Sequence, residues 1–253
     1  MNTEKKRVAL ITGAGGGIGH ATLCHFASCG WRVIGVDRRG LDEPIPGEGI
    51  YIQADISLEE NLRSIYEQAR AFSPTLDAVI NNAAIQIAKP LVETSAEEWD
   101  LVMASNLRSV FLGAKLAHPL LLAEGGGAIV NVSSVHAVAT SMNIASYAAS
   151  KGGLLALTRA MAIEFARDNI RVNAILPGAV DTPMLRASMD RMDDGTLQDR
   201  LDNLARKTVN GRVGRPEEIA RSIYFLADST QSSFITGQAL IVDGGATARL
   251  STE

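Results

Sequence analysis

Short aliphatic runs alternate with longer amphipathic stretches along almost the whole chain, and no other feature constrains the fold as strongly. The runs span residues 7–12, 31–37, 76–81, 128–134, 170–176 and 238–244. Stretches with apolar residues at three- and four-residue steps lie between them, at 17–29, 58–72, 96–122, 146–167 and 216–227. Parallel strands are buried on both faces, so they appear as continuous apolar runs, and helices connect one to the next. The pattern predicts an α/β fold built on a parallel sheet.

The length of 253 residues suits one domain, because α/β folds commonly reach this size around a single sheet. We find no repeat, low-complexity segment or linker, so residues 1–253 are predicted to form a single domain. Residues 181–214 interrupt the alternation and are rich in Asp, Arg and Met. Long insertions in compact domains are usually functional or disordered. We interpret this segment as a lid over a pocket, with an exposed helical excursion as the alternative.

Charge and cysteine content argue against several classes of partner. With 24 Lys and Arg against 28 Asp and Glu, the chain lacks the basic field that attracts nucleic acid or anionic lipid. It has neither a run of 18 apolar residues nor a secretion signal before the first glycine. Cys24 and Cys29 are five residues apart in a predicted helix, which is poor geometry for a disulfide. We expect a cytoplasmic protein that binds no nucleic acid, membrane or metal ion.

A glycine-rich turn follows the first strand directly and opens the first helix. It runs from Thr12 through Gly13, Gly15, Gly16 and Gly17 to Gly19. In this context glycines let backbone amides approach a pyrophosphate, which predicts a dinucleotide site. The alternative is an ordinary strand-to-helix turn, since such turns often need glycine.

Asp37 favours the dinucleotide interpretation and NAD in particular. It ends the second strand 24 residues after Gly13, near the offset of about 20 residues at which an acidic side chain reaches the adenosine ribose. A carboxylate at this position repels a 2′-phosphate. Arg38 and Arg39 follow at once, and either can bind a phosphate, so NADP remains the second choice.

Tyr147 and Lys151 are four residues apart in a predicted helix, so their side chains share one face. An ammonium group beside a phenol favours the phenolate and lowers the phenol pKa, which makes tyrosine a usable acid or base. Most tyrosine and lysine pairs at this spacing are half-exposed surface pairs. Ser133 and Ser134 give this pair a context, because they end a strand at the sheet edge where α/β folds bind ligands. Two serines that merely start a turn are the alternative.

Four motifs resemble those of the short-chain dehydrogenase/reductase family in order and spacing, across nearly the whole chain. They are Thr12-Gly13-x3-Gly17-x-Gly19, Asn81-Asn82-Ala83-Ala84, Ser134 with Tyr147-x3-Lys151, and Pro177-Gly178. The second motif departs mildly from the family, which more often ends it in Ala-Gly. The resemblance implies a Rossmann-type doubly wound parallel sheet and an NAD(P)-dependent oxidoreductase that acts on CH–OH donors.

The resemblance also implies a role for each of four residues. Tyr147 is the expected general acid and base, and Lys151 the partner that lowers its pKa and holds the nicotinamide ribose. Ser134, 13 residues before the tyrosine as in the family, is preferred over Ser133 as the donor to the substrate oxygen. Asn106 matches the family's helix asparagine, which binds a water in a proton relay; a helix kink or a buried amide is the alternative.

The remaining matches concern the cofactor, which Tyr147 and Lys151 also contact in the family. They are Gly13, Gly17, Ile18 and Gly19 at the pyrophosphate turn, Asp55 and Ile56 beside the adenine, Asn82 and Ala83 under the adenosine ribose, and Pro177, Gly178, Val180 and Thr182 along the carboxamide. Family members that prefer NADP often carry a basic residue just before the second motif glycine, where this chain has Gly16. This agrees with Asp37, so NAD is the expected cofactor.

The expected reaction interconverts a secondary alcohol and a ketone. The residues expected by position to border the substrate are Gln86, Ser134, His136, Asn143 and Met184. Polar donors mixed with flexible apolar surface suit a small polar substrate: a sugar, polyol or hydroxyacyl compound. One alternative is an NADPH-dependent 3-oxoacyl-thioester reductase, and a second is a nucleotide-binding sensor without catalysis.

The family usually forms tetramers that bury two long helices and the last strand. Residues 234–245, ending in Asp243-Gly244-Gly245, resemble that interface segment. The resemblance therefore implies a homotetramer.

Overall fold

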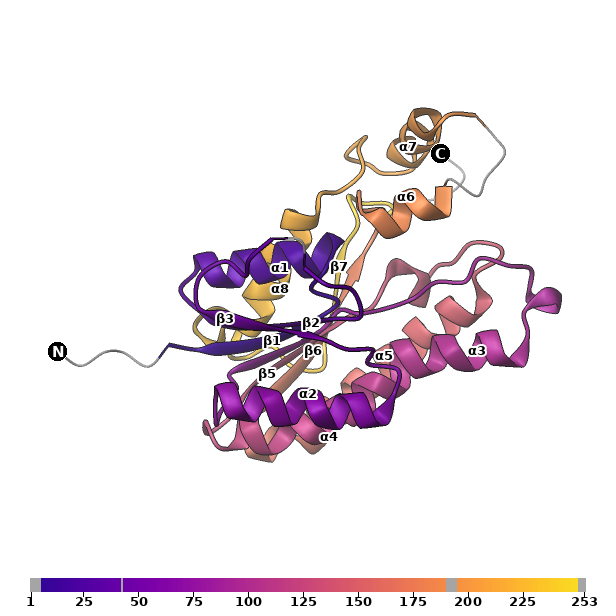
Figure 1. The fold of residues 1–253 in the computed structure, drawn as a ribbon. Helices are drawn as coiled ribbons and strands as arrows, with labels where there is room; N and C mark the ends of the chain where they lie inside the picture. Colours follow the sequence, from indigo (N-terminus) through magenta and orange to yellow (C-terminus); the bar gives the residue numbers. More distant parts are fainter. Residues whose placement is uncertain (1–5, 42, 190–194, 250–253) are drawn as a thin grey trace.

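The computed structural model describes residues 6–41, 43–189 and 195–249 (Figure 1). Its centre is a seven-stranded sheet in the order β3-β2-β1-β4-β5-β6-β7, in which every neighbouring pair is parallel. The strands are β1 Val8–Thr12, β2 Arg32–Asp37, β3 Gly49–Gln53, β4 Ala78–Asn81, β5 Gly127–Val132, β6 Ile170–Pro177 and β7 Ala239–Val242. The predicted doubly wound parallel sheet is confirmed.

Strand β3 was absent from the sequence-based prediction, which had six strands. It forms the outer edge of the sheet and pairs with β2 alone. Of its five residues Ile52 is the buried one, whereas β1 is buried throughout. An edge strand with so little burial lacks the continuous aliphatic run by which the other strands were recognised.

Helices cover both faces of the sheet. One layer contains α1 Gly17–Ser28 and α8 Pro216–Ala227, and the other contains α2 Glu59–Phe72, α4 Ser109–Leu122 and α5 Ala145–Glu164 (Figure 1). Each layer has its own apolar cluster, with Phe26 and Ile223 at the centre of one and Leu120 and Leu154 within the other. Shorter elements complete the order: η1 Leu91–Glu93, α3 Ala96–Met103, η2 Ala104–Arg108, η3 Val135–Ala137, η4 Ala166–Asp168, α6 Pro183–Met189, α7 Leu197–Arg206 and α9 Ser229–Ser232.

The predicted helix over 96–122 is divided. Between α3 and α4 the backbone widens into one π-helical turn, η2, in which Ser105 and Asn106 are buried. A π turn adds a residue to the helix and rotates the side chains that follow. The insertion lies where Asn106 bonds to two other segments, so a tertiary contact replaces regular helix geometry.

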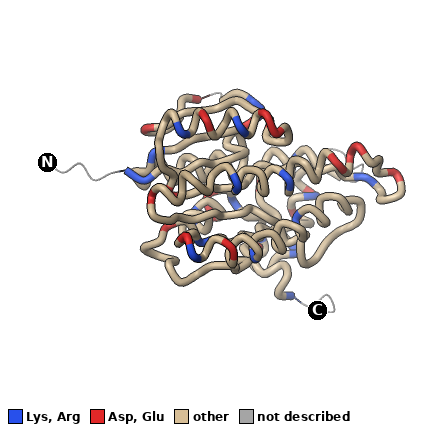
Figure 2. Tube along the Cα trace, turned by 90° about the horizontal axis from the view of Figure 1, so that it is seen from below, with Lys and Arg blue, Asp and Glu red and all other residues tan. Residues whose placement is uncertain are grey.

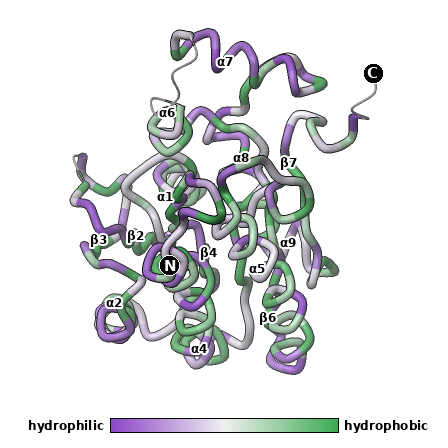
Figure 3. The backbone as a smooth tube through the Cα atoms, turned by 90° about the vertical axis from the view of Figure 1, so that its right-hand side faces the viewer, coloured by the Kyte–Doolittle hydropathy of each residue, from purple (hydrophilic) through white to green (hydrophobic). Residues whose placement is uncertain are grey.

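Helices α6 and α7 lie above the carboxyl edge of the sheet, outside the two helix layers (Figures 1 and 3). Thr182 starts α6 by accepting a hydrogen bond from the Leu185 amide, and Thr196 with Asp199 forms a capping box at the start of α7. These helices belong to the segment 181–214 predicted as a lid, of which residues 190–194 lie outside the described part.

Acidic and basic residues are interspersed along the Cα trace (Figure 2). Within the described ranges, no helix combines the length and apolar character needed to cross a membrane.

Candidate active site

A cavity of about 870 Å³ opens at the carboxyl edge of the sheet, under α6. Five strands lead into its wall: Asp37 is the last residue of β2, and four lining residues come directly after β1, β4, β5 and β6, namely Gly13, Asn82, Ser133 and Gly178. This is the edge at which open α/β sheets bind ligands, because loops from several strands converge there.

The glycine turn at one end of the cavity has no room for side chains. Gly13 and Gly17 have positive φ values of +70° and +50°, which favour glycine. A Cβ on Gly19 would lie 1.9 Å from the Gly13 carbonyl oxygen. The Asn82 amide closes the turn by donating hydrogen bonds to the carbonyls of Thr12 at 3.0 Å and Gly13 at 3.3 Å.

This turn fits the pyrophosphate of a dinucleotide. Helix α1 starts at Gly17 without a side-chain cap, so its first backbone amides remain available to an anion. The Arg39 guanidinium lies beside the turn, 2.7 Å from where a Cβ on Gly16 would be, and adds a cation. Backbone donors, a helix N-terminus and a cation together meet the requirements of a phosphate group.

Asp37 is 9% exposed and bonds to the glycine turn. Its Oδ2 accepts from the Gly15 amide at 3.0 Å, and its Oδ1 accepts from the Arg39 amide at 3.0 Å and Nε at 3.4 Å. The Tyr51 hydroxyl donates to the Arg39 carbonyl at 2.8 Å. The carboxylate therefore lies beside the glycine turn and holds Arg39 close to it.

Most of the residues matched to the cofactor line this one cavity: Gly13, Gly17, Ile18, Asp37, Asp55, Ile56, Asn82, Ala83, Tyr147, Lys151, Pro177, Gly178, Val180 and Thr182. Gly19 lies behind the turn instead, where its missing side chain lets Asn82 approach. The Asn82 side chain bonds to the turn, so its part in the site is to position the glycines.

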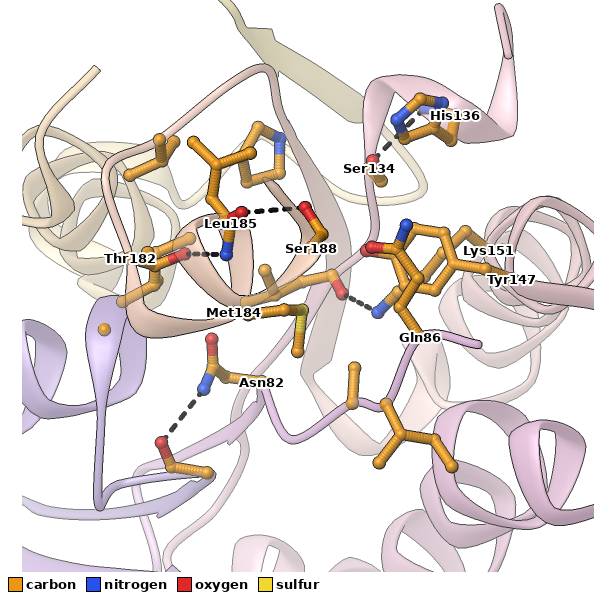
Figure 4. A pocket seen from close by; sticks show the side chains of 18 of the residues that line it. Asn82, Gln86, Ser134, His136, Tyr147, Lys151, Thr182, Met184, Leu185 and Ser188 are labelled. Carbon is orange, nitrogen blue, oxygen red and sulfur yellow. Dashed lines mark hydrogen bonds between the residues drawn. The ribbon is translucent and has the colours of Figure 1, made fainter. Parts of the chain in front are cut away.

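The other end of the cavity brings Ser134, Tyr147 and Lys151 together (Figure 4). All three are buried, with exposures of 7%, 8% and 2%. Lys151 Nζ lies 5.6 Å from the centre of the Tyr147 ring and donates to the Val132 carbonyl at 2.8 Å. This bond anchors the ammonium group to the end of β5, so strand and helix hold the phenol and the amine in a fixed relation.

The structure distinguishes the two serines that follow β5. Ser133 donates its hydroxyl to the Lys151 carbonyl at 3.0 Å, so it joins the strand to α5. Ser134 starts η3, and its Oγ accepts from the His136 amide at 3.2 Å. A hydrogen bond from Ser134 also lowers the pKa of Tyr147. Ser134 is thus the serine whose hydroxyl proton faces the phenol and the cavity.

Burial dominates the pKa values of the tyrosine and the lysine. It raises the pKa of Tyr147 to about 12, against the smaller lowering effect of Ser134. It lowers the pKa of Lys151 to about 7. Loss of solvent penalises the charged form of both groups. The lowering of the phenol pKa by Lys151 stays a prediction.

We expect the unfolding free energy to rise with pH between about 7 and 9.5. Unfolded Lys151 keeps its proton up to its ordinary pKa of 10.5, whereas folded Lys151 loses it above about 7. The unfolded state then binds more protons, which makes the slope positive, with an upper limit of about 1.4 kcal/mol per pH unit. Urea denaturation across this range, compared with Lys151→Met, provides the measurement. Equal slopes in the two proteins would contradict the assignment to Lys151.

Asn106 lies behind the cavity and does not line it. Its Nδ2 donates to the Ile85 carbonyl at 2.9 Å and to Ser150 Oγ at 3.0 Å, and its Oδ1 accepts from the Ile85 amide at 2.9 Å. Ser150 in turn donates to the Tyr147 carbonyl at 2.7 Å. The side chain is fully engaged within the protein, so it joins the loop after β4 to the helix that carries Tyr147. The alternative of a buried amide at a helix irregularity describes it well.

Of the residues expected near the substrate, Gln86, Ser134, His136 and Met184 line the cavity, and Asn143 does not. Asn143 adopts a left-handed turn with φ of +66° and is exposed, and its carbonyl accepts from the Lys89 amide. Its contact with the substrate stays a prediction. Sequence reasoning missed several lining residues: Leu101, Ser105, Leu185, Ser188, Leu204 and Lys207. Those on α6 and near α7 follow Thr182 and Thr196, whose capping positions indicate where these two helices start.

Comparisons with known proteins agree with this geometry. Residues 13–247 match the family model described as enoyl-(acyl carrier protein) reductase. The chain is 36% identical to the 3-oxoacyl-[acyl-carrier-protein] reductase of Thermotoga maritima, over 97% of this chain and 99% of that protein. It is 38% identical to cis-4-hydroxycyclohexanecarboxylate dehydrogenase of Sinomonas cyclohexanicum, over 96% and 97%. Aldohexose dehydrogenase of Thermoplasma acidophilum superposes with a TM-score of 0.92 at 28% identity, covering 98% and 96%.

The fold, the cavity and these relatives lead to one conclusion. The chain belongs to the short-chain dehydrogenase/reductase family and is an NAD(P)-dependent oxidoreductase that acts on CH–OH groups.

Proposed function

We propose that this protein is an NAD-preferring dehydrogenase that interconverts a small polar secondary alcohol, such as a sugar, polyol or hydroxyacyl compound, with its ketone. One observation carries the proposal. Ser134, Tyr147 and Lys151 lie at one end of the same cavity whose other end holds the glycine turn and Asp37. Proton-transfer groups and a dinucleotide cradle are therefore within reach of one bound substrate.

In the oxidative direction the alcohol oxygen accepts a hydrogen bond from Ser134, and its proton passes to the Tyr147 oxygen. This oxygen takes up the proton as the phenolate, the form that a charged Lys151 beside it and the hydrogen bond from Ser134 favour against the effect of burial. The carbinol carbon loses a hydride as the ketone forms, and reduction reverses both transfers. A nicotinamide bound in the cavity would accept this hydride in oxidation and donate it in reduction. Ser134 orients the oxygen, and Lys151, held by the Val132 carbonyl, fixes the surroundings of the phenol. Asn106 and Ser150 act as positioning residues through the Tyr147 carbonyl.

A screen of alcohols, sugars and hydroxyacyl thioesters with NAD and NADP tests the proposal, with reduced nucleotide followed by its absorbance. We expect turnover of small polar secondary alcohols with NAD. Preference for 3-oxoacyl thioesters with NADPH would favour the alternative function, which the similarity to the Thermotoga maritima reductase supports. Nucleotide binding without turnover of any compound would favour a sensor.

Cofactor choice is expected to depend on Asp37. In Asp37→Asn, the carboxylate no longer repels a 2′-phosphate or pairs with Arg39, whose Nε lies 3.4 Å from it. Arg39 is then free to pair with that phosphate. The ratio of NADP to NAD affinity should rise at least tenfold, as measured by calorimetric titration of both nucleotides.

Glu60→Gln provides the matched control, because it removes one negative charge from an exposed position on α2. Its nucleotide preference should equal that of the original protein. An unchanged ratio in Asp37→Asn would contradict the assigned role.

We further propose that the chain is one domain, that α6 and α7 form a lid, and that four copies assemble. Exposed apolar side chains lie on the two long helices and around the last strand, which suits mutual burial: Phe111, Leu122, Ile163, Phe234, Leu240 and Ile241. Sedimentation velocity measures the assembly, with a homotetramer expected.

A further inference from the structure

Two polar side chains at the Tyr147 end of the cavity are left without protein partners. His136 Nδ1 is buried and forms no hydrogen bond among the described residues. The half-buried Gln86 carboxamide also bonds to no described residue, although it lines the same cavity. Buried polar groups normally find partners, so such groups in a cavity indicate a polar ligand.

The protonation state of His136 decides which hydrogen bonds its ring can form with a ligand. Burial lowers its pKa, so the ring is neutral near pH 7 and carries one N–H donor. A buried N–H without a partner costs more than an unpaired acceptor nitrogen. We therefore place the proton on Nε2, which is not among the buried unpaired atoms, so that the ring of this cavity-lining residue can donate from Nε2 while Nδ1 stays an unpaired acceptor.

His136 lies close to Ser134 and Tyr147, the residues at the reacting end of the cavity. The residue lies in η3, and its backbone amide donates to Ser134 Oγ at 3.2 Å. Its ring packs edge-on against Tyr147, with centres 6.1 Å apart and an interplanar angle of 74°. Figure 4 shows His136 beside Ser134, with Gln86 and Tyr147 on the same side of the cavity. A substrate held by the two hydroxyls thus meets His136 within a short distance of its reacting carbon.

Among the described residues no cation bonds to His136 or Gln86. Of the cations that line the cavity, Lys151 donates to the Val132 carbonyl, and Arg39 is held by Asp37, which Arg38 follows in the chain. Lys207 lines the cavity as an exposed residue directly after α7. The recognition that His136 and Gln86 themselves offer is by neutral hydrogen bonds.

We propose that His136 and Gln86 bind a neutral oxygen on the carbon next to the reacting carbon, so that the substrate is a vicinal diol or, in reduction, an α-hydroxyketone. The imidazole donates to this second oxygen, and the carboxamide donates or accepts as the oxygen requires. The inference rests on the proposed function and narrows it to a substrate class. It selects polyols and sugars from the three compound types.

The test compares cyclohexanol with trans-1,2-cyclohexanediol, using NAD and reporting kcat and KM separately. The unmodified protein should have at least tenfold higher kcat/KM for the diol, mainly through a lower KM. His136→Leu and Gln86→Leu should each reduce this ratio at least fivefold. His136→Gln, which keeps a donor near the position of Nε2, should restore part of it, as a merely structural role would not. His118→Gln, remote from the cavity on α4, should keep the original ratio.

The outcomes separate this inference from the function on which it rests. Equal kcat/KM for both alcohols would overturn the inference and leave the dehydrogenase function intact. Preference for 3-hydroxybutyrate over the diol would also overturn it, since an anion would then be recognised. Absence of turnover with every alcohol and both nucleotides would overturn the proposed function and the inference together.

Discussion

Replacement of Tyr147 by Phe is expected to lower kcat for alcohol oxidation about a thousandfold, within the range that general acid and base catalysis contributes. The phenol is buried with Ser134 and Lys151 in the cavity, and its hydroxyl is the group to which the substrate proton would pass. Loss of one oxygen atom leaves the ring and its packing against His136 in place. Nucleotide affinity, measured by fluorescence titration, should change by less than threefold.

Tyr66→Phe is the matched control for this experiment. Tyr66 is 5% exposed in the core beneath α2 and does not line the cavity, so loss of its hydroxyl removes nothing from the proposed chemistry. Its kcat should stay within twofold of the original. If Tyr147→Phe retained normal turnover while still binding nucleotide, the proposed proton transfer would be wrong.

Replacement of Gly19 by Ala is the second change for which we expect a large effect, in nucleotide binding and in stability. The added Cβ would lie 1.9 Å from the Gly13 carbonyl oxygen and 2.5 Å from Asn82 Nδ2. Backbone must move to make room, and the movement breaks the contact between the glycine turn and the loop after β4. We expect nucleotide affinity to fall at least tenfold and the unfolding free energy to fall by about 1–3 kcal/mol.

Gly152→Ala tests whether any added methyl group has this effect. A Cβ on Gly152, in α5, would have its nearest neighbour 3.9 Å away at the Ala137 carbonyl. Alanine also favours helix by up to about 1 kcal/mol over glycine, so this variant should be as stable as the original or more so. Titration calorimetry and urea denaturation of both variants supply the measurements. Normal nucleotide affinity in Gly19→Ala would show that the turn tolerates displacement.

Helices and strands with a clear local sequence pattern could be predicted. Elements whose form depends on their place in the fold or on contacts with distant residues could not. Helix α8 was predicted with the observed bounds because Pro216 and its apolar periodicity are local features. Strand β3 was missed because it is an edge strand with one buried side chain. The π turn at Asn106 was predicted as regular helix, since the hydrogen bond between Asn106 and Ser150, 44 residues away, leaves no local pattern in the sequence.

The residues of the candidate site likewise fall into two groups, those that the sequence could indicate and those that it could not. Tyr147 and Lys151 were recognised from a spacing of four residues and from the resemblance to a family. Asn143 was expected beside the substrate but does not line the cavity; its carbonyl accepts from the Lys89 amide, a contact between distant residues that no local pattern indicates. The sequence could not indicate that His136 Nδ1 lacks a hydrogen-bond partner, since this depends on which atoms the fold places around the ring.

The sequence by itself determined the parallel sheet, the glycine turn after β1 and the acid at the end of β2, because burial and turn geometry act on neighbouring residues. Tertiary structure alone bonded the Ser133 hydroxyl to the Lys151 carbonyl, and it turned the Asn82 amide onto a glycine turn 69 residues earlier in the chain. It also decided the burial that raises the pKa of Tyr147 to about 12. Hydrogen bonding and desolvation depend on atoms brought together from distant segments, and residue spacing carries no record of them.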